Sequence, residues 1–329
     1  MKTVLLSAPY IMASLDRFMP VFKHYGVNML VADVTERLDE EDILKYAGQF
    51  DGVICGDDRF TEKVMSTCLP RLKVISKWGT GIDSIDLEAA KRLDIQVCNT
   101  PNAFTLPVAD TVLGYILAFA RNIPWMDADI KRGEWQKTPG KSLAELTLGV
   151  VGVGNIGKAV IQRAHGFGMR LFGNDVVKID PEFVNDNQIT MLSLPELLSR
   201  SDYVSLNCDL NPTSRHLMND KTFGLMKADA VLINTSRGPV VDEPALIRAL
   251  HAGNLRGAAL DVFEVEPLPP DSPLKQLRNV LLGSHNSNSS PMAWERVHWN
   301  TIRNLLEGLG VPCDDLERIG DKAINGGSL

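Results

Sequence analysis

The chain has 329 residues, of which 44% are hydrophobic and 23% charged. This length exceeds one ordinary core and predicts two domains of a globular protein, with no apolar run near the roughly 18 residues of a membrane helix. The formal net charge of −7 comes without a block of Lys and Arg, so neither nucleic acid nor an anionic membrane is expected as a partner. The 6 histidines show no metal-binding spacing, and no metal is expected.

The N-terminal segment MKTVLLSAPYIMA resembles a secretory signal only faintly, because Val4 to Leu6 is its whole continuous apolar run before Ser7. The 5 cysteines are odd in number and form no C-x-x-C pair, which is typical of reduced thiols. Both observations favour a cytoplasmic protein whose first residues form a β-strand.

Residues 1–100 alternate short apolar runs with amphipathic stretches, the runs being TVLLSAP, NMLVADV, GVICG, KVISKWG and IQVCNT. This alternation of strand and helix predicts a parallel sheet with crossover helices.

A second alternating series follows a break at Pro101 and Pro107 and a long apolar helix, VADTVLGYILAFARNI. Its runs are LTLGVVGVG, RLFGND, YVSLNC, AVLINTSRG, GAALDVF and NVLLGSH, and a helix after Pro291 is long enough to return to the first domain. We therefore expect an α/β protein of two doubly wound parallel-sheet domains with a cleft between them, one of residues 1–100 plus 294–329 and the other of residues 101–293.

A G-x-G-x-x-G sequence lies at Gly152, Gly154 and Gly157, directly after an apolar strand and before a helical pattern. In that setting the glycines make a tight turn, admit a pyrophosphate and allow close packing, and the helix N-terminus attracts the phosphates. Eighteen residues after Gly157, the next strand ends in Asp175, which suits a ribose 2′-hydroxyl and repels a 2′-phosphate. The sequence therefore predicts NAD rather than NADP, unless Asp175 is only the turn residue that ends the strand.

The motifs VGVGNIG, NTSRGPVVDE, LDVFEVEP and, in part, GSHN, with KWGTGIDSIDLEAA near the N-terminus, resemble the D-isomer-specific 2-hydroxyacid dehydrogenase family, in general pattern the phosphoglycerate dehydrogenases. The resemblance implies a flavodoxin-like substrate domain that includes the C-terminal helix, and a central Rossmann domain that binds NAD. It also implies a homodimer paired through the segment around Val112 to Ala120, although a buried internal helix would show the same pattern.

The resemblance gives catalytic roles to Arg237 of TSRG, Glu266 of FEVEP and His285 of GSHN. It implies that Arg237 holds the substrate carboxylate, Glu266 supports the histidine and His285 exchanges a proton. The chemistry agrees, since an imidazole can gain and lose a proton near neutral pH and an arginine binds a carboxylate through two parallel hydrogen bonds. Taken singly, Arg237 is also compatible with a turn residue, Glu266 with a surface charge and His285 with a loop donor, but all three lie just beyond the ends of predicted parallel strands, where ligands of such sheets bind.

The same resemblance implies further contacts. In KWGTGID the substrate carboxylate would meet the backbone of Gly79, Thr80 and Gly81, and Lys77 would meet a second anionic group unless it is an exposed strand-end lysine. The implied cofactor contacts, besides the three glycines and Asp175, are Asn155, Ile156, Asn207, Pro212, Thr235, Ser236 and Asp261.

After the histidine this chain departs from the family pattern, with Asn286, Ser287, Asn288 and Ser289 where relatives carry apolar and small residues. The departure bears on the substrate rather than on the reaction. We expect an NAD-dependent oxidoreductase that interconverts a D-2-hydroxy acid and a 2-oxo acid, with a 3-phosphoglycerate-like or other polar acid as the first substrate. The alternatives are a glyoxylate or hydroxypyruvate reductase and a non-enzymatic NAD-sensing regulator of the same fold.

Overall fold

The computed structural model describes residues 1–319 and divides the chain into two compact units. Unit 1 comprises Met1–Ala103 and the chain from Ser290 onward, and unit 2 comprises Phe104–Ser289. All five cysteines fall within the described residues and are free thiols. None of the helices in residues 1–319 is both long and apolar enough to span a bilayer.

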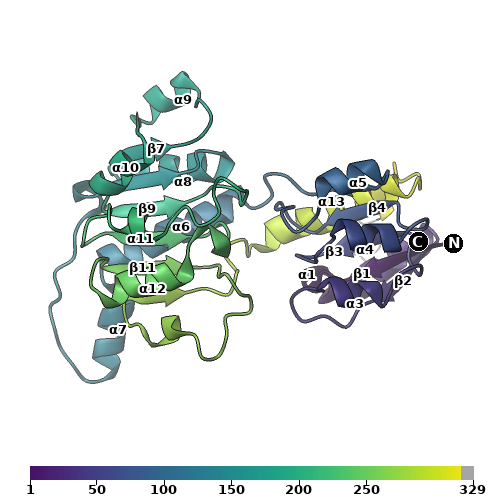
Figure 1. Cartoon of the computed structure of the whole chain (residues 1–329), viewed down its shortest axis with the longest axis horizontal. Coiled ribbons are helices and arrows are strands. Elements are labelled where there is room, and N and C mark those ends of the chain that lie inside the picture. The colour runs from purple at the N-terminus through teal and green to yellow at the C-terminus, as the bar shows by residue number, and fades with distance from the viewer. Residues whose placement is uncertain (320–329) are drawn as a thin grey trace. The chain divides into compact units, whose positions relative to one another are not determined.

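Unit 1 is a five-stranded parallel sheet in the order β2-β1-β3-β4-β5, which is the flavodoxin-like order (Figure 1). Its strands are β1 (Lys2–Leu6), β2 (Val27–Val31), β3 (Gly52–Cys55), β4 (Val74–Lys77) and β5 (Gln96–Cys98). Its helices are α1 (Pro9–Met12), α2 (Leu15–His24), α3 (Glu40–Leu44), α4 (Glu62–Thr67), α5 (Leu87–Arg92) and α13 (Pro291–Gly308). Every residue of β3 and β4 is buried, as expected of central parallel strands covered on both faces.

Helix α13 packs against β3 and β4 and so belongs to unit 1. The approach is close at Gly308, where an added Cβ would lie 2.4 Å from Cγ2 of Val74. The unit boundaries at 103/104 and 289/290 lie a few residues from the predicted ones. The second boundary precedes Pro291, so unit 1 contains the whole of α13.

Unit 2 is a seven-stranded parallel sheet in the order β12-β11-β10-β9-β6-β7-β8. Its strands are β6 (Thr147–Val151), β7 (Arg170–Asn174), β8 (Thr190–Met191), β9 (Tyr203–Leu206), β10 (Val231–Asn234), β11 (Gly257–Leu260) and β12 (Val280–Leu282). Its helices are α6 (Thr105–Ala120), α7 (Ile123–Lys131), α8 (Asn155–Gly166), α9 (Pro181–Asp186), α10 (Leu194–Arg200), α11 (Asp220–Phe223) and α12 (Glu243–His251), with short 3₁₀ turns at Leu143–Glu145, Gly238–Val240 and Pro273–Gln276. The strand order reverses at β6, and ligands of such sheets bind where the order reverses, at the carboxyl ends of the strands.

The two parallel α/β sheets confirm the predicted fold class. The long apolar helix is α6, whose buried side chains, among them Val112, Ile116 and Phe119, pack inside unit 2. The apolar residues that suggested a pairing surface are therefore core residues of unit 2. The strand pattern missed only β8, which has two residues.

Candidate active site

The glycine turn follows β6 with no room for side chains at two of its positions. Gly152 has φ +87°, and an added Cβ would lie 2.6 Å from the backbone N of Cys208. A Cβ on Gly157 would lie 2.0 Å from the carbonyl oxygen of Gly152. Gly154, by contrast, faces open space and starts α8 without a side-chain cap. This is the geometry in which a phosphate approaches the N-terminus of a helix.

Asp175 follows β7 and faces the glycine turn. Its Oδ2 accepts the backbone N–H of Val153 at 2.6 Å, and its Oδ1 accepts that of Val177 at 3.0 Å. The carboxylate is thus fixed beside the turn, and the neighbouring Val176 is 92% exposed. Asp175 thus follows the last residue of its strand and is held beside the glycine turn, so the contacts agree with both alternatives.

Two buried polar atoms near the turn have no hydrogen-bond partner within the described residues, Oδ1 of Asn207 and Oγ1 of Thr235. They follow β9 and β10, at the same edge of the sheet as the glycine turn. Such enclosed polar atoms are costly unless a ligand or water satisfies them, so the residues present fit a bound dinucleotide. Ile156 is half-buried in the first turn of α8, whereas Pro212 is exposed in the loop after β9.

Arg237 lies in a loop that Asn234 organises from the end of β10. The buried Asn234 side chain donates to the carbonyl of Arg237 at 3.0 Å, and its Oδ1 accepts the N–H and hydroxyl of Ser236 at 3.1 and 2.8 Å. The Arg237 guanidinium donates to the Ser236 carbonyl at 2.9 Å. The backbone that carries Arg237 is therefore held by side-chain hydrogen bonds.

Glu266 and His285 form a pair in unit 2. Oε2 of Glu266 lies 2.9 Å from Nδ1 of His285, and its Oε1 accepts the backbone N–H of Phe263 at 2.8 Å. Both side chains are about one-fifth exposed, which leaves the pair accessible at one side. A carboxylate in this place fixes the ring orientation and favours the tautomer with the proton on Nδ1.

Asp261, at the end of β11, holds the loop that carries His285. Its carboxylate accepts the backbone N–H of Asn286 at 3.0 Å and of Ser287 at 2.8 Å, and its carbonyl accepts that of His285 at 2.7 Å. His285 itself adopts φ +53°, a left-handed conformation that persists only where the surroundings enforce it. The sequence indicated only a cofactor contact for Asp261, whereas the structure shows that it also anchors the histidine loop.

The Arg237 loop and the Glu266 loop are in direct backbone contact. A Cβ added to Gly238 would lie 1.8 Å from the carbonyl oxygen of Phe263, so only glycine fits there. Arg237, Glu266 and His285 are thus joined through one continuous set of contacts at the carboxyl edge of the unit 2 sheet. Within residues 1–319, no group of three or more His, Cys, Asp or Glu residues is placed to hold a metal ion.

The predicted substrate residues Lys77, Gly79, Thr80 and Gly81 belong to unit 1. Gly79 has φ +122° and its carbonyl accepts the N–H of Thr100 at 2.8 Å, while the Thr80 hydroxyl donates to the Thr100 carbonyl at 2.9 Å. Lys77 is only 4% exposed, and its Nζ lies 3.0 Å from Asp57 and donates to the Trp78 carbonyl at 3.1 Å. The alternative of an exposed lysine is therefore wrong, and the charge of Lys77 is already balanced inside unit 1.

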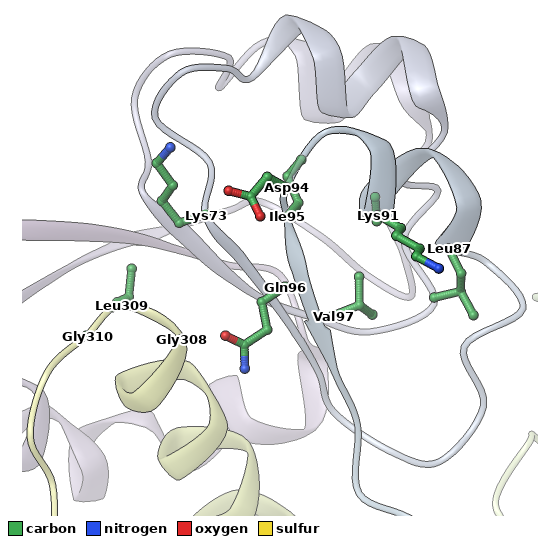
Figure 2. A pocket seen from close by; sticks show the side chains of 11 residues that line it. Lys73, Leu87, Lys91, Asp94, Ile95, Gln96, Val97, Gly308, Leu309 and Gly310 are labelled. Atoms are coloured by element: carbon green, nitrogen blue, oxygen red, sulfur yellow. The ribbon is translucent and has the colours of Figure 1, made fainter.

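A separate hollow of about 620 Å³ lies on unit 1 (Figure 2). Its lining includes Lys73 and Gln96, at the amino-terminal ends of β4 and β5, and the end of α13 at Gly308. The candidate substrate turn follows β4 at its other end, and none of the candidate cofactor or substrate residues lines this hollow.

Comparison with known proteins gives one family. A family model described as D-isomer specific 2-hydroxyacid dehydrogenase, NAD binding domain, matches residues 113–287. A D-3-phosphoglycerate dehydrogenase of Methanocaldococcus jannaschii is 38% identical over 282 residues, which cover 84% of this chain but 52% of that protein, so the chain spans about half of its length. A glyoxylate reductase of Thermofilum pendens is 39% identical over 274 residues, covering 81% of this chain and 80% of that protein.

Among solved structures, a D-lactate dehydrogenase from Aquifex aeolicus complexed with NAD and lactic acid is similar at a TM-score of 0.81 and 27% identity. The similarity covers 99% of this chain and 98% of that one. The chain therefore belongs to the D-isomer-specific 2-hydroxyacid dehydrogenase family.

Proposed function

We propose that this protein interconverts a D-2-hydroxy acid and the matching 2-oxo acid, with His285 as the proton-transfer group. The observation that carries the proposal is the 2.9 Å contact between Nδ1 of His285 and Glu266, in a site that also contains the Arg237 loop. Oxidation of an alcohol at carbon requires a base for the hydroxyl proton, and an oriented imidazole is the side chain best suited to it.

The glycine turn and Asp175 would hold the dinucleotide, which when bound would accept a hydride as NAD⁺ in oxidation and donate one as NADH in reduction. In the oxidation direction, Nε2 of His285 takes the proton of the substrate hydroxyl, and the ring becomes an imidazolium whose charge the Glu266 carboxylate stabilises. In reduction His285 returns that proton to the oxygen of the 2-oxo group. Asp261 keeps the imidazole in place during both directions through its hold on the 285–287 backbone.

Arg237 is proposed to bind the substrate carboxylate with its planar guanidinium, which offers two parallel donors. Asn234 supports this role, because it fixes the Arg237 backbone from a buried position. The backbone of Gly79, Thr80 and Gly81 in unit 1 remains the second proposed carboxylate contact.

For the substrate we favour a polar 2-oxo acid whose only anionic group is its carboxylate over a phosphorylated one. Lys77, which was expected to contact a second anionic group of the substrate, is buried and already forms an ion pair with Asp57. The loop after the histidine presents Asn286 and Ser289 at the surface, where amide and hydroxyl groups suit substrate hydroxyls. The named relatives act on phosphoglycerate and glyoxylate by their names, so both types belong in the test.

The test measures NADH oxidation with glyoxylate, hydroxypyruvate, other 2-oxo acids without a phosphate group, and 3-phosphohydroxypyruvate. We expect turnover with an acid that carries no phosphate, and a His285→Asn variant should lose roughly 10²- to 10⁴-fold in kcat while binding NADH as the wild type does. An equally active His285→Asn variant would contradict the proposed proton transfer, and a wild type that reduces none of these acids would favour a regulatory NAD-binding role.

We also propose a homodimer. None of the nine residues of α7 is buried in the described part of the chain, and Ile123, Ile130 and Trp135 are 52%, 50% and 82% exposed. Exposed apolar side chains of this size are typical of a partner surface. Light scattering should give twice the chain mass of 36.2 kDa, and a Trp135→Glu variant should shift the mass toward one chain.

The cytoplasm is the proposed compartment. All five cysteines are unpaired within the described residues, and two of them, Cys55 and Cys68, are fully buried thiols. Unpaired thiols of this kind are typical of a reducing compartment. Cell fractionation with an antibody against the chain tests it, and recovery from a secreted fraction would contradict it.

A further inference from the structure

A second histidine–carboxylate pair lies beside the proposed site and takes no part in the proton transfer described above. Nε2 of His216 lies 2.6 Å from Oε1 of Glu264, with the two side chains 40% and 25% exposed. Glu264 stands two residues before Glu266, in the same loop after β11.

His216 is attached to the segment that continues from Arg237. Its backbone N–H donates to the carbonyl of Pro239 at 2.8 Å, and the ladder continues with Met218 donating to Val240 at 3.1 Å. His216 adopts φ +49°, and its carbonyl accepts the side-chain amide of Asn219 at 2.8 Å. The imidazole therefore projects from a restrained backbone.

Glu264 is held from its other side as well. Its backbone N–H donates to Oε2 of Glu243, the first residue of α12, at 3.3 Å. Burial raises the pKa of the Glu243 carboxyl, and the neighbouring Glu264 charge raises it further.

The Arg237 and Glu266 loops are therefore connected at two places. One is the backbone contact between Gly238 and Phe263, and the other is the His216–Glu264 pair. We propose that His216 and Glu264 are positioning residues, which hold Glu266 and Arg237 at the mutual distance that catalysis requires. The proposal rests on the proposed function, in which Arg237 binds the carboxylate and Glu266 orients His285.

The first experiment compares Glu264→Ala and Glu264→Gln with Lys227→Ala as the matched control. Lys227 forms an ion pair of similar exposure with Asp202 at 2.9 Å, at the start of β9 and therefore at the opposite edge of the sheet. Glu264→Ala should lower kcat/KM roughly 10- to 100-fold, with a higher KM for the 2-oxo acid and a lower kcat, because misplacement by about 1 Å has effects of this size. NADH affinity should stay within about twofold, and Glu264→Gln should retain most activity, because its amide oxygen still accepts a hydrogen bond from His216.

Kinetics of Glu264→Ala that match those of Lys227→Ala would overturn the proposal, since the pair would then contribute only to stability. A Glu264→Gln variant whose kcat/KM is as low as that of Glu264→Ala would also overturn the proposal.

A second readout needs no turnover. The ¹⁵N NMR signals of the His285 ring should move in Glu264→Ala, because Glu266 is displaced, and should not move in Lys227→Ala. A wild-type protein that reduces none of the acids would refute the proposed function, and the ring signals would still decide whether Glu264 positions Glu266. Unchanged ring signals in Glu264→Ala would refute the positioning role.

Discussion

At the residue scale, Asp175 is the side chain that we expect to decide between NADH and NADPH. Its two oxygens are fixed by the backbone N–H groups of Val153 and Val177, so the negative charge stays beside the glycine turn. We predict that Asp175→Ala raises the KM for NADH about tenfold, since a hydrogen bond to a charged group contributes about 1.5–3 kcal/mol, and narrows the preference over NADPH. Asp186→Ala, which removes an exposed carboxylate from the end of α9, is the control and should leave both constants unchanged.

Also at this scale, the sequence indicates which residues end parallel strands but not which of them pair. Asp175, Arg237 and His285 could be predicted because each follows an apolar run and has a recognisable neighbour sequence. The pairing of Lys77 with Asp57 could not, because it joins the last residue of β4 to the loop after β3 and no local pattern encodes it. The His216–Glu264 pair could not be predicted for the same reason, because its two residues are 48 positions apart in the chain.

At the element scale, helix α8 contains a glycine at each end with opposite requirements. A Cβ on Gly157 would meet the Gly152 carbonyl at 2.0 Å, whereas a Cβ on Gly166 would meet no described atom within 4 Å. We predict that Gly157→Ala opens the turn and abolishes measurable NADH binding. Gly166→Ala should preserve binding and leave the protein as stable or up to about 1 kcal/mol more stable, because alanine is the better helix former. Titration calorimetry with NADH and thermal melting of the two variants check this pair, and tight NADH binding by Gly157→Ala would contradict the role of the turn.

The elements themselves were largely readable from the sequence, because central parallel strands are continuous apolar runs. β3, β4, β6, β9, β10 and β11 are buried at every position, and each matches a predicted run. The role of α6 was not readable, since an apolar helix looks the same whether it packs on its own sheet or on a partner. The structure assigns its buried face to the core of unit 2 and leaves α7 as the exposed apolar helix.

At the scale of the whole molecule, two buried groups of unit 1 give the stability opposite dependences on pH. Burial lowers the pKa of His298 to about 4, although Glu295 raises it in part, and its Nδ1 accepts the indole N–H of Trp78 at 2.9 Å. Burial raises the pKa of Asp58 to about 6, although hydrogen bonds from Ser7 and Leu38 lower it in part. Each of these pKa changes contributes about 3 kcal/mol to the pH dependence of the free energy of unfolding, because one pKa unit corresponds to about 1.4 kcal/mol.

Between pH 4 and 6.5 the unfolded state binds more protons at His298 than the folded state, so this histidine makes the protein less stable as the pH falls. Between pH 3.8 and 6 the folded state binds more protons at Asp58, so this carboxyl makes the protein more stable as the pH falls. The two effects offset each other over most of the shared range.

We predict that the free energy of unfolding of Asp58→Asn, which keeps the shape of the side chain, falls by about 3 kcal/mol relative to that of the wild type as the pH goes from 6.5 to 4. His298→Gln should show the reverse and gain stability relative to the wild type over the same range. Urea unfolding of the three proteins at a series of pH values measures the differences, and parallel pH curves for wild type and Asp58→Asn would mean that Asp58 is ionised in the folded protein throughout.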